Sequence, residues 1–167
     1  AEGSNGKLWL GTDRGLLERK ASGGVGPAKN GPTSEVTSLL VDAAERLWVG
    51  SEEGLWLVDG DRAQLLPDTP SVRGLALAPG GDVWVAARRK VLRVTLGGGT
   101  PVVAVERGYV GTALAASPEG ALWVGREMGG LFRVERLEDD VGFVAADGIP
   151  DLSIVALTMD ANGGVWG

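Results

Sequence analysis

The 167-residue sequence contains no cysteine and no histidine. Without cysteine, the chain can form no disulfide bond and can offer no thiolate to a metal or a substrate. Without histidine, it lacks the commonest general base and the commonest metal ligand. These absences argue against most hydrolase and metalloenzyme mechanisms, and we expect no cofactor, no metal site and no catalytic residue in this sequence.

Basic residues and long apolar runs are also scarce. The 16 basic residues are outnumbered by 22 acidic ones, and the resulting net charge of −6 disfavours binding to nucleic acid. No apolar stretch approaches the ~20 residues that a membrane-spanning helix needs. The first residues, AEGSNG, show no charged head followed by an apolar stretch, so no signal peptide is visible, although a mature chain after removal of a leader would look the same.

Glycine, by contrast, is abundant, with 28 residues in the chain, more than twice the usual share of ~7%. Five tryptophans mark a repeat in which many of these glycines recur. Leu or Val precedes each marker tryptophan, and glycine recurs three residues before it and two residues after it, with Glu45 and Ala86 as exceptions. A period of about forty residues therefore organises the chain. The marker tryptophans are Trp9, Trp48, Trp84, Trp123 and Trp166, spaced 39, 36, 39 and 43 residues apart.

Residues 35–48 have apolar side chains at a helical spacing, but the repeat favours strands there. The equivalent segments 72–84, 111–123 and 153–166 carry Pro-Gly, Pro-Glu-Gly or Asn-Gly where a helix would have to continue, and such sequences mark turns. All copies should share one conformation. We therefore predict a strand, a turn and a second strand in each of them.

Each repeat is expected to hold four strands, called A to D in chain order. Strand A is expected at 36–41, 72–77, 112–116 and 154–159, and strand B around each marker tryptophan. Strand C is expected at 15–19, 54–58, 91–95 and 130–134. Strand D is expected at 62–67, 101–106 and 142–147, and its first copy is hard to place within 21–32. The predicted fold class is thus all-β, a β-propeller of four-stranded antiparallel blades.

Strand A alternates a small and a bulky position. Leucine stands nine residues before each later marker tryptophan, and the residue before that leucine is always small. Because neighbouring strand residues point to opposite faces, one face presents a bulky side chain, and the other is kept small where strands crowd near a central axis. The pairs are Ser38-Leu39, Gly74-Leu75, Ala113-Leu114 and Ala156-Leu157.

The repeat, written D-x-x-G-x-[LV]-W-[VL]-G-[TS]-x-x-G-L, resembles that of the two-component regulator propeller family. Residues 6–16, 42–55 and 120–131 carry the resemblance, whereas the third copy departs from it at Ala86 and Lys90. In that family, such repeats form the extracytoplasmic input domain of bacterial sensor kinases. The resemblance therefore implies a signal-transduction module in the bacterial periplasm or another extracytoplasmic space.

We expect one propeller domain over residues 1–167 that is part of a larger ring. The sequence begins in a strand B, at residues 8–10, and reaches the next equivalent strand at residues 165–167. It thus holds four repeat lengths with strand B duplicated. We expect a piece of a ring of about seven or eight blades, or two copies that complete a ring together. Closure of four blades on one another is the alternative.

Several conspicuous residues are assigned to structure. The marker tryptophans could stack on sugars, but their recurrence between apolar strand neighbours favours packing between blades, and Trp56 is assigned to packing too. Asp42 and Asp160 are expected to accept backbone hydrogen bonds in the turn between strands A and B. Residues 160–163 carry two of the oxygen ligands of a calcium loop, a weak signal. The acidic run 135–140 is expected to be a solvated loop.

The variable positions inside the repeat are the candidates for binding. In a propeller, the B–C turns and the loops from strand D to the next strand A emerge on one face around the channel mouth, and such loops usually carry specificity. Mixed charge there could hold a polar or anionic ligand, because arginine suits carboxylate or sulfate; solubility is the alternative role for each residue. The candidate mouth residues are Asp13, Arg14, Glu52, Glu53, Arg73, Arg88, Arg89, Arg107, Tyr109, Arg126 and Glu127.

These features favour a non-catalytic propeller that senses a small polar or anionic ligand or a protein partner. A propeller that only scaffolds protein–protein contacts is the alternative, and a large flat face without a formed pocket would favour it. An enzyme resembling the streptogramin lyases, whose blades also carry a Gly-x-Val-Trp repeat, is disfavoured because those enzymes need a histidine and a metal. We expect no nucleic-acid partner and no membrane span.

Overall fold

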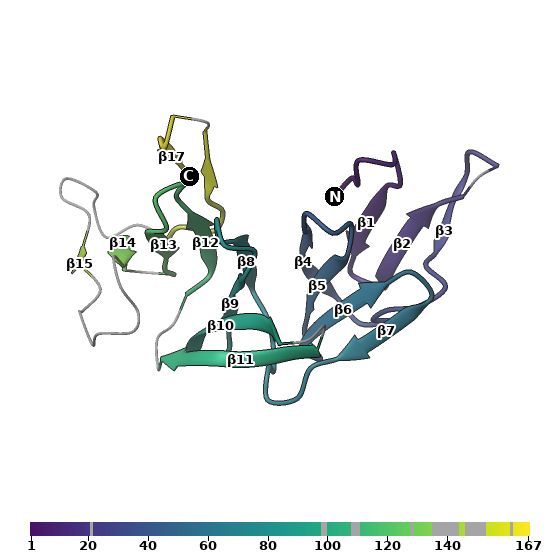
Figure 1. The fold of residues 1–167 in the computed structure, drawn as a ribbon, viewed down its shortest axis with the longest axis horizontal. Coiled ribbons are helices and arrows are strands. Elements are labelled where there is room, and N and C mark those ends of the chain that lie inside the picture. Colours follow the sequence, from purple (N-terminus) through teal and green to yellow (C-terminus); the bar gives the residue numbers. More distant parts are fainter. Residues whose placement is uncertain are drawn as a thin grey trace. The chain divides into compact units, whose positions relative to one another are not determined.

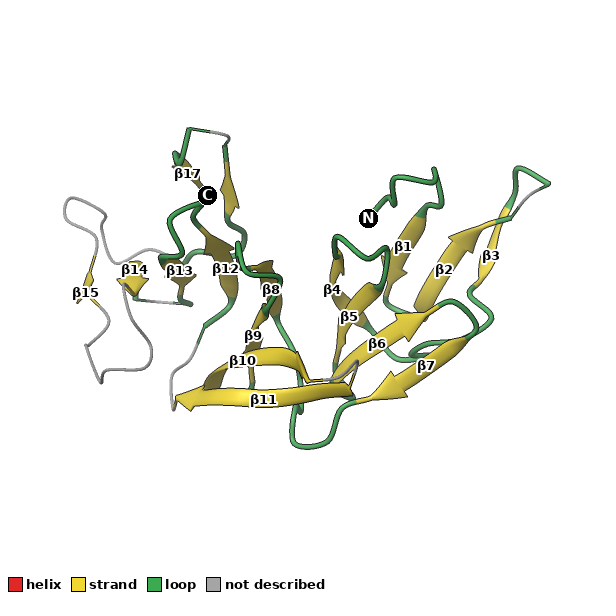
Figure 2. Cartoon of the chain, viewed as in Figure 1, coloured by secondary structure: helices red, strands yellow, loops and turns green. Residues whose placement is uncertain are grey.

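The repeats of the sequence fold into antiparallel strands (Figure 1). The computed structural model describes residues 1–20, 22–97, 100–107, 111–127, 129–134, 144–145, 153–160 and 162–167. These residues form strands β1 to β17 and contain no helix, so none that could cross a membrane (Figure 2). The predicted all-β class is confirmed.

The chain forms two units, Ala1–Arg73 and Gly74–Gly167, whereas the expectation of a single domain stays a prediction. In the first unit, one sheet holds β1, β2 and β3 and another holds β4 to β7, each in chain order. The first sheet comprises β1 (Trp9–Thr12), β2 (Gly15–Arg19) and β3 (Val25–Pro27). The second comprises β4 (Val36–Val41), β5 (Leu47–Ser51), β6 (Leu55–Asp59) and β7 (Arg62–Leu65).

Residues 35–48 confirm the strand interpretation. Strands β4 and β5 pair antiparallel, with Leu40 opposite Trp48 and Val41 opposite Leu47. All six residues of β4 are half-buried, so apolar side chains occur on both of its faces. A strand that is partly buried on both faces lacks the alternation of an ordinary surface strand, which explains why the segment imitates a helical spacing.

The first sheet holds more of a strand A than predicted. Glu2 forms a β-bridge with Leu8. The amino group of Ala1 donates to the carbonyl oxygen of Trp9 over 3.0 Å, and the Trp9 amide donates back to Ala1 over 2.9 Å. In the second sheet, the last two residues of β4, Leu40 and Val41, pair in the same way with Trp48 and Leu47. Ala1 and Glu2 therefore pair beside Trp9 and Leu8 as the end of a strand A does, a pairing that the sequence did not predict.

The second unit holds two four-stranded sheets and a hairpin. The strands are β8 (Gly74–Leu77), β9 (Val83–Ala87), β10 (Lys90–Gly97), β11 (Thr100–Arg107), β12 (Ala113–Ala116), β13 (Leu122–Gly125), β14 (Leu131–Val134), β15 (Val144–Ala145), β16 (Thr158–Met159) and β17 (Val165–Trp166). The strand expected at 154–159 is only two residues long, since residues 153–157 form no ladder. Strand β11 includes Arg107, which was expected in a loop and pairs with Val91 instead.

Marker tryptophans pack between consecutive sheets, as predicted. In the first unit, Trp9 clusters with Leu47 and Val49 of the next sheet, and Trp56 packs against the same cluster. In the second unit, Trp84 clusters with residues of β12 and β13. Trp9, Trp48 and Trp84 are at most 6% exposed, whereas Trp123 is half-buried and Trp166 is 64% exposed. The packing role thus holds for the first three.

The glycine two residues after each marker tryptophan fits a larger residue of the following strand A. A Cβ at Gly50 would lie 2.6 Å from Val72 Cγ1, and one at Gly125 would lie 2.5 Å from Ile154 Cγ2. In the third repeat the sizes are reversed, because Ala86 stands at the glycine position and Gly111 at the position of the larger residue. A Cβ at Gly111 would lie 3.5 Å from the Ala86 Cβ. The departure at Ala86 is therefore compensated by its partner, and the strand is retained.

Candidate functional site

Hydroxyl side chains close the first two B–C turns. Thr12 Oγ1 donates to the carbonyl oxygen of Gly15 over 2.8 Å. Ser51 Oγ donates likewise to Gly54 over 3.0 Å. Both glycines have positive φ, 108° and 147°, a region that favours glycine. The motif [TS]-x-x-G is thus a turn whose two central residues are free to vary.

The third repeat closes its turn without that glycine. Ala87 pairs with Lys90, so Arg88 and Arg89 form the turn. Arg89 takes the left-handed conformation itself, with φ of 61°, at a cost of about 1–2 kcal/mol for a residue with a Cβ. Both arginine side chains are exposed. The departure from the motif therefore leaves the turn intact and places two cations on it.

Backbone hydrogen bonds fix the B–C turns to the neighbouring D–A loops. The Glu52 amide donates to the Glu35 carbonyl over 3.2 Å, and the Glu52 carbonyl accepts the Ser71 amide over 3.1 Å. In the second unit, the Ile154 amide donates to the Arg126 carbonyl over 2.9 Å. Turns and loops therefore lie together within each unit, as expected for one face of a propeller.

Most of the candidate mouth residues are exposed on these turns and loops. Arg126 is half-buried, with its guanidinium 5.4 Å from the centre of the Phe132 ring. Tyr109 and the acidic run 135–140 lie outside the described residues. Whether any of the candidates binds a ligand stays a prediction. The exposed ones are Asp13, Arg14, Glu52, Glu53, Arg73, Arg88, Arg89 and Glu127.

Arg73 stands where two other repeats have threonine, eleven residues before the marker tryptophan. The Thr37 hydroxyl donates to the Val72 carbonyl over 2.7 Å, and the Thr112 hydroxyl donates to the Ile154 carbonyl over 2.6 Å. These bonds tie consecutive strand A segments together. The longer Arg73 side chain is exposed instead, which makes this position a candidate for binding.

A hollow of about 390 Å³ lies beside Glu53 in the first unit. We call it the Glu53 hollow. The loop after β7 supplies the rest of its lining, and Leu65 is 41% exposed there. The residues around it are Glu53, Leu65, Leu66, Pro67, Asp68, Thr69 and Pro70.

Thr69 holds the loop of the Glu53 hollow in place. Its hydroxyl accepts the Leu55 amide over 3.1 Å and donates to the Leu66 carbonyl over 2.9 Å. Thr69 is 2% exposed, and Asp68 beside it has φ of 55°. Sequence reasoning selected Glu53 but missed this loop. The only available signal was the spacing of Pro67 and Pro70 around two polar residues.

Asp42 closes the A–B turn of the second repeat. Its carboxylate accepts the amides of Ala44 and Arg46 and the indole Nε1–H of Trp48, the last over 3.0 Å. Burial raises the pKa of this carboxyl, but the hydrogen bonds from Trp48 and Arg46 outweigh it and hold the pKa below its ordinary value. The predicted turn role is confirmed, and the indole bond explains the spacing of Asp and Trp in the motif.

Asp160 has the same role. It accepts the amides of Asn162 and Gly164 and the Nε1–H of Trp166, and these bonds lower its pKa. Its oxygens therefore already have hydrogen-bond donors. In the part of the chain that the structure describes, no three acidic side chains gather as a metal site would require.

The repeats without that aspartate hold a cation over the tryptophan. Arg93 lies 5.7 Å from the centre of the Trp84 ring and is bound to Asp82 over 2.7 Å. Lys7 lies 5.1 Å from the centre of the Trp9 ring. A second hollow, of about 250 Å³, borders Trp84, but the ring is 6% exposed and has Arg93 over it. Stacking of a sugar on this ring is therefore disfavoured.

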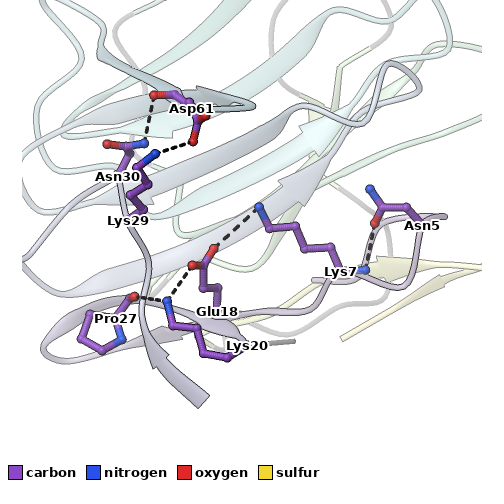
Figure 3. A network of polar contacts seen from close by, with 8 residues as sticks. All are labelled: Asn5, Lys7, Glu18, Lys20, Pro27, Lys29, Asn30 and Asp61. Atoms are coloured by element: carbon purple, nitrogen blue, oxygen red, sulfur yellow. Dashed lines mark hydrogen bonds and ion pairs between the residues drawn. The ribbon is translucent and has the colours of Figure 1, made fainter. Parts of the chain in front are cut away.

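Figure 3 shows polar contacts in the first unit that involve none of the candidate mouth residues. Glu18 is bound by Lys20 over 2.7 Å and by Lys7 over 3.6 Å. The hydrogen bond from Lys20 lowers the pKa of Glu18. Lys29 and Asn30 bind Asp61 in the β6–β7 turn. These charges are paired, which supports a structural role for them.

No protein-family model and no curated protein matches the sequence. Solved structures do match it. Virginiamycin B lyase from Staphylococcus aureus aligns over 99% of this chain with a TM-score of 0.74 and 16% identity. The extracellular domain of a putative hybrid two-component system from B. thetaiotaomicron aligns over 99% with a TM-score of 0.74 and 17% identity. A gluconolactonase from Xanthomonas campestris aligns over 100% with a TM-score of 0.72 and 13% identity.

These similarities define the class: the chain folds as part of a β-propeller. It spans 60% of the lyase chain, 24% of the two-component extracellular domain and 67% of the gluconolactonase. Enzymes and sensor domains share this fold, and at these identities the similarity shows the fold alone. Function has to be argued from the loops.

Proposed function

We propose that the chain is part of a non-catalytic β-propeller that senses a ligand or protein partner in the periplasm or another extracytoplasmic space. The observation that carries the proposal is the loop face. Its B–C turns are closed by Thr12 and Ser51, and the Glu52 backbone is bonded to the loops on either side. Exposed charged side chains on such a fixed scaffold are typical of recognition. The matched extracellular domain of a two-component system supports a sensing role.

Arg88 and Arg89 give the proposed binding its chemistry. Both are exposed on a two-residue turn, so their guanidinium groups can approach a ligand without rearrangement of the strands. A guanidinium binds two oxygens of a carboxylate or sulfate at once. A small anionic ligand such as an acidic sugar fits this turn, and its binding would be passed on through altered packing against a neighbouring domain.

An enzyme of the matched kinds is disfavoured. A second structure of the lyase contains a catalytically inactive variant, in which alanine replaces a histidine, together with quinupristin. The present sequence has no histidine, so it offers no equivalent group. Incubation with quinupristin and with a sugar lactone tests the point, and turnover of either would favour the enzyme.

A thermal-shift screen with glucuronate, galacturonate and Ca²⁺ tests the sensing proposal. We expect an acidic sugar to raise the melting temperature of the chain and of an R19A/R62A control, whose exposed arginines lie at the other ends of their strands. The R88A/R89A variant should lose the shift. The scaffold alternative would be favoured if no small molecule shifts the chain and a protein partner binds through the same face.

A further inference from the structure

We propose that the Glu53 hollow binds an organic cation, an ammonium or guanidinium group carried on an apolar stem. The group could belong to a free amine or to a lysine or arginine side chain. This inference goes beyond the proposed function, because it requires neither the Arg88–Arg89 turn nor an anionic ligand. It rests on the charge, the apolar lining and the fixed shape of the hollow.

The charge of the hollow is uncompensated. Glu53 and Asp68 are exposed, and within the described ranges neither has a hydrogen bond or an ion pair through its side chain. Two other acidic side chains of the same unit have a basic partner, Asp42 with Arg46 and Asp61 with Lys29. No lining residue is basic. A bound cation would supply the missing partner.

Apart from the buried Thr69, the rest of the lining is apolar. Leu65 is 41% exposed, and the exposed Pro67 and Pro70 flank the loop. An alkyl stem can cover such surface while its charged end stays near the carboxylates and water, as lysine and arginine side chains do on protein surfaces. The lining suits Ca²⁺ poorly, because Ca²⁺ takes six to eight oxygen ligands.

The hollow is formed before any ligand arrives. Thr69 bonds to Leu55 and Leu66 and fixes the loop against β6. A Cβ at Gly54 would lie 2.8 Å from the Thr69 carbonyl oxygen and 3.1 Å from Leu65 Cδ1, so the loop packs on a residue without a side chain. A fixed site loses little conformational entropy on binding, which favours affinity for a ligand that fits it.

NMR titration of the ¹⁵N-labelled chain tests the proposal. The probes are n-hexylamine and the tripeptide Ac-Gly-Lys-Gly-NH₂, with hexanoate, hexanol and Ca²⁺ as controls. We expect n-hexylamine to shift the amide signals of Gly54, Asp68 and Thr69 and to leave that of Gly120 in place. The tripeptide distinguishes the sources: binding tighter than that of the amine indicates a partner's side chain, and weaker binding indicates a free amine.

Two conservative variants remove the charges. Glu53→Gln keeps the shape of the side chain. Asp68→Asn introduces asparagine, which readily adopts the left-handed backbone of this position. Each should weaken n-hexylamine binding about threefold, and the double variant about tenfold, as expected for exposed charge pairs. Asp59→Asn, which changes an exposed acid at the opposite end of β6 from the hollow, should bind as the unchanged chain does. Far-UV circular dichroism confirms that each variant is folded.

Four results would overturn the proposal. Equal binding of hexanoate or hexanol would show an apolar surface without charge selection. Unchanged affinity in the double variant would place the cation elsewhere, as would shifts confined to amides outside the hollow. Shifts of the same amides by Ca²⁺ with none by n-hexylamine would indicate a metal site.

Discussion

The sheets β4–β7 and β8–β11 hold the same tryptophan in two different ways. In β5, the Trp48 indole donates to Asp42, and the residue opposite it in β6 is Leu57. In β9, Trp84 has Ala78 at the place of the aspartate and Arg93 opposite it. Arg93 lies over the ring and is bound to Asp82.

The difference teaches which parts of the repeat are interchangeable. Trp48 and Trp84 are both buried, so the packing of the ring is common to both sheets. The polar partner of the ring varies, an anion at the indole nitrogen in one sheet and a cation over its face in the other. The third repeat makes the same kind of exchange at Ala86 with Gly111, whereas at Arg89 the turn keeps its shape at the cost of a left-handed residue. Departures from the motif at the tryptophan and at the glycine after it therefore come with local compensation.

Removal of the buried tryptophan ring, which both sheets share, should have the largest effect on stability. Trp48→Ala should destabilise the chain by about 3–5 kcal/mol, the usual cost of emptying a large aromatic site, and Trp84→Ala should cost about as much. Trp166→Ala should cost under about 1 kcal/mol, because that ring is 64% exposed. Urea denaturation measures all three. A loss below about 1 kcal/mol for Trp48→Ala would revive the sugar-stacking hypothesis.

Loss of the polar partner of the tryptophan should cost more stability in the sheet β4–β7 than in the sheet β8–β11. Asp42→Asn should cost about 2–3 kcal/mol, because an amide cannot satisfy both Arg46 and the buried Trp48 Nε1–H. Asp82→Asn should cost at most about 1 kcal/mol, since its pair with Arg93 is partly exposed. Equal costs in urea denaturation would contradict the distinction.

The Asp42 effect should depend on pH. The folded pKa of Asp42 lies below its ordinary value of 3.8. The stabilisation of the fold by the ionised Asp42 carboxylate is therefore complete above pH 3.8. It is lost as the pH falls through the lower pKa of the folded state. The stability difference between the natural chain and Asp42→Asn should shrink in this acidic range, and a difference that grows on acidification would have the wrong sign.

The glycine after the tryptophan should tolerate a methyl group only when its partner shrinks. Gly50→Ala should cost about 1–3 kcal/mol by overpacking, because the new Cβ would lie 2.6 Å from Val72 Cγ1. The Gly50→Ala and Val72→Ala double variant should lose at least about 1 kcal/mol less than the sum of the single changes. Strict additivity would show that the two positions do not compensate each other.

The smallest effect is expected at Glu45. It has φ of 62°, where Gly81 of the third repeat has 88°. Glu45→Gly should relieve the strain and stabilise the chain by about 0.5 kcal/mol, after loss of the bond that Glu45 accepts from Ser4. Gly81→Glu should destabilise by about 1 kcal/mol. Thermal melts of the two variants should move in opposite directions, and a shift in the same direction would contradict the comparison.

Strands B and C were predictable because each copy repeats the tryptophan and a turn at a fixed distance. The first strand D, at Val25–Pro27, carries no such marker, and the pairing of Ala1 and Glu2 beside Trp9 and Leu8 is too short to show periodicity. Exposure of the turn residues Glu52, Glu53, Arg88 and Arg89 was also predictable. The Glu53 hollow was not, because it depends on the Thr69 hydroxyl, whose partners are Leu55, 14 residues away, and Leu66 in the same loop.

The central claim is that the repeat folds the chain and its exposed loops recognise a charged ligand. The most direct test compares the unchanged chain with R88A/R89A by differential scanning calorimetry, with and without galacturonate. We predict melting temperatures that agree without the sugar, since exposed substitutions change stability by about 0.5 kcal/mol or less. The sugar should stabilise only the unchanged chain. Equal stabilisation of both, or of neither, would contradict the account.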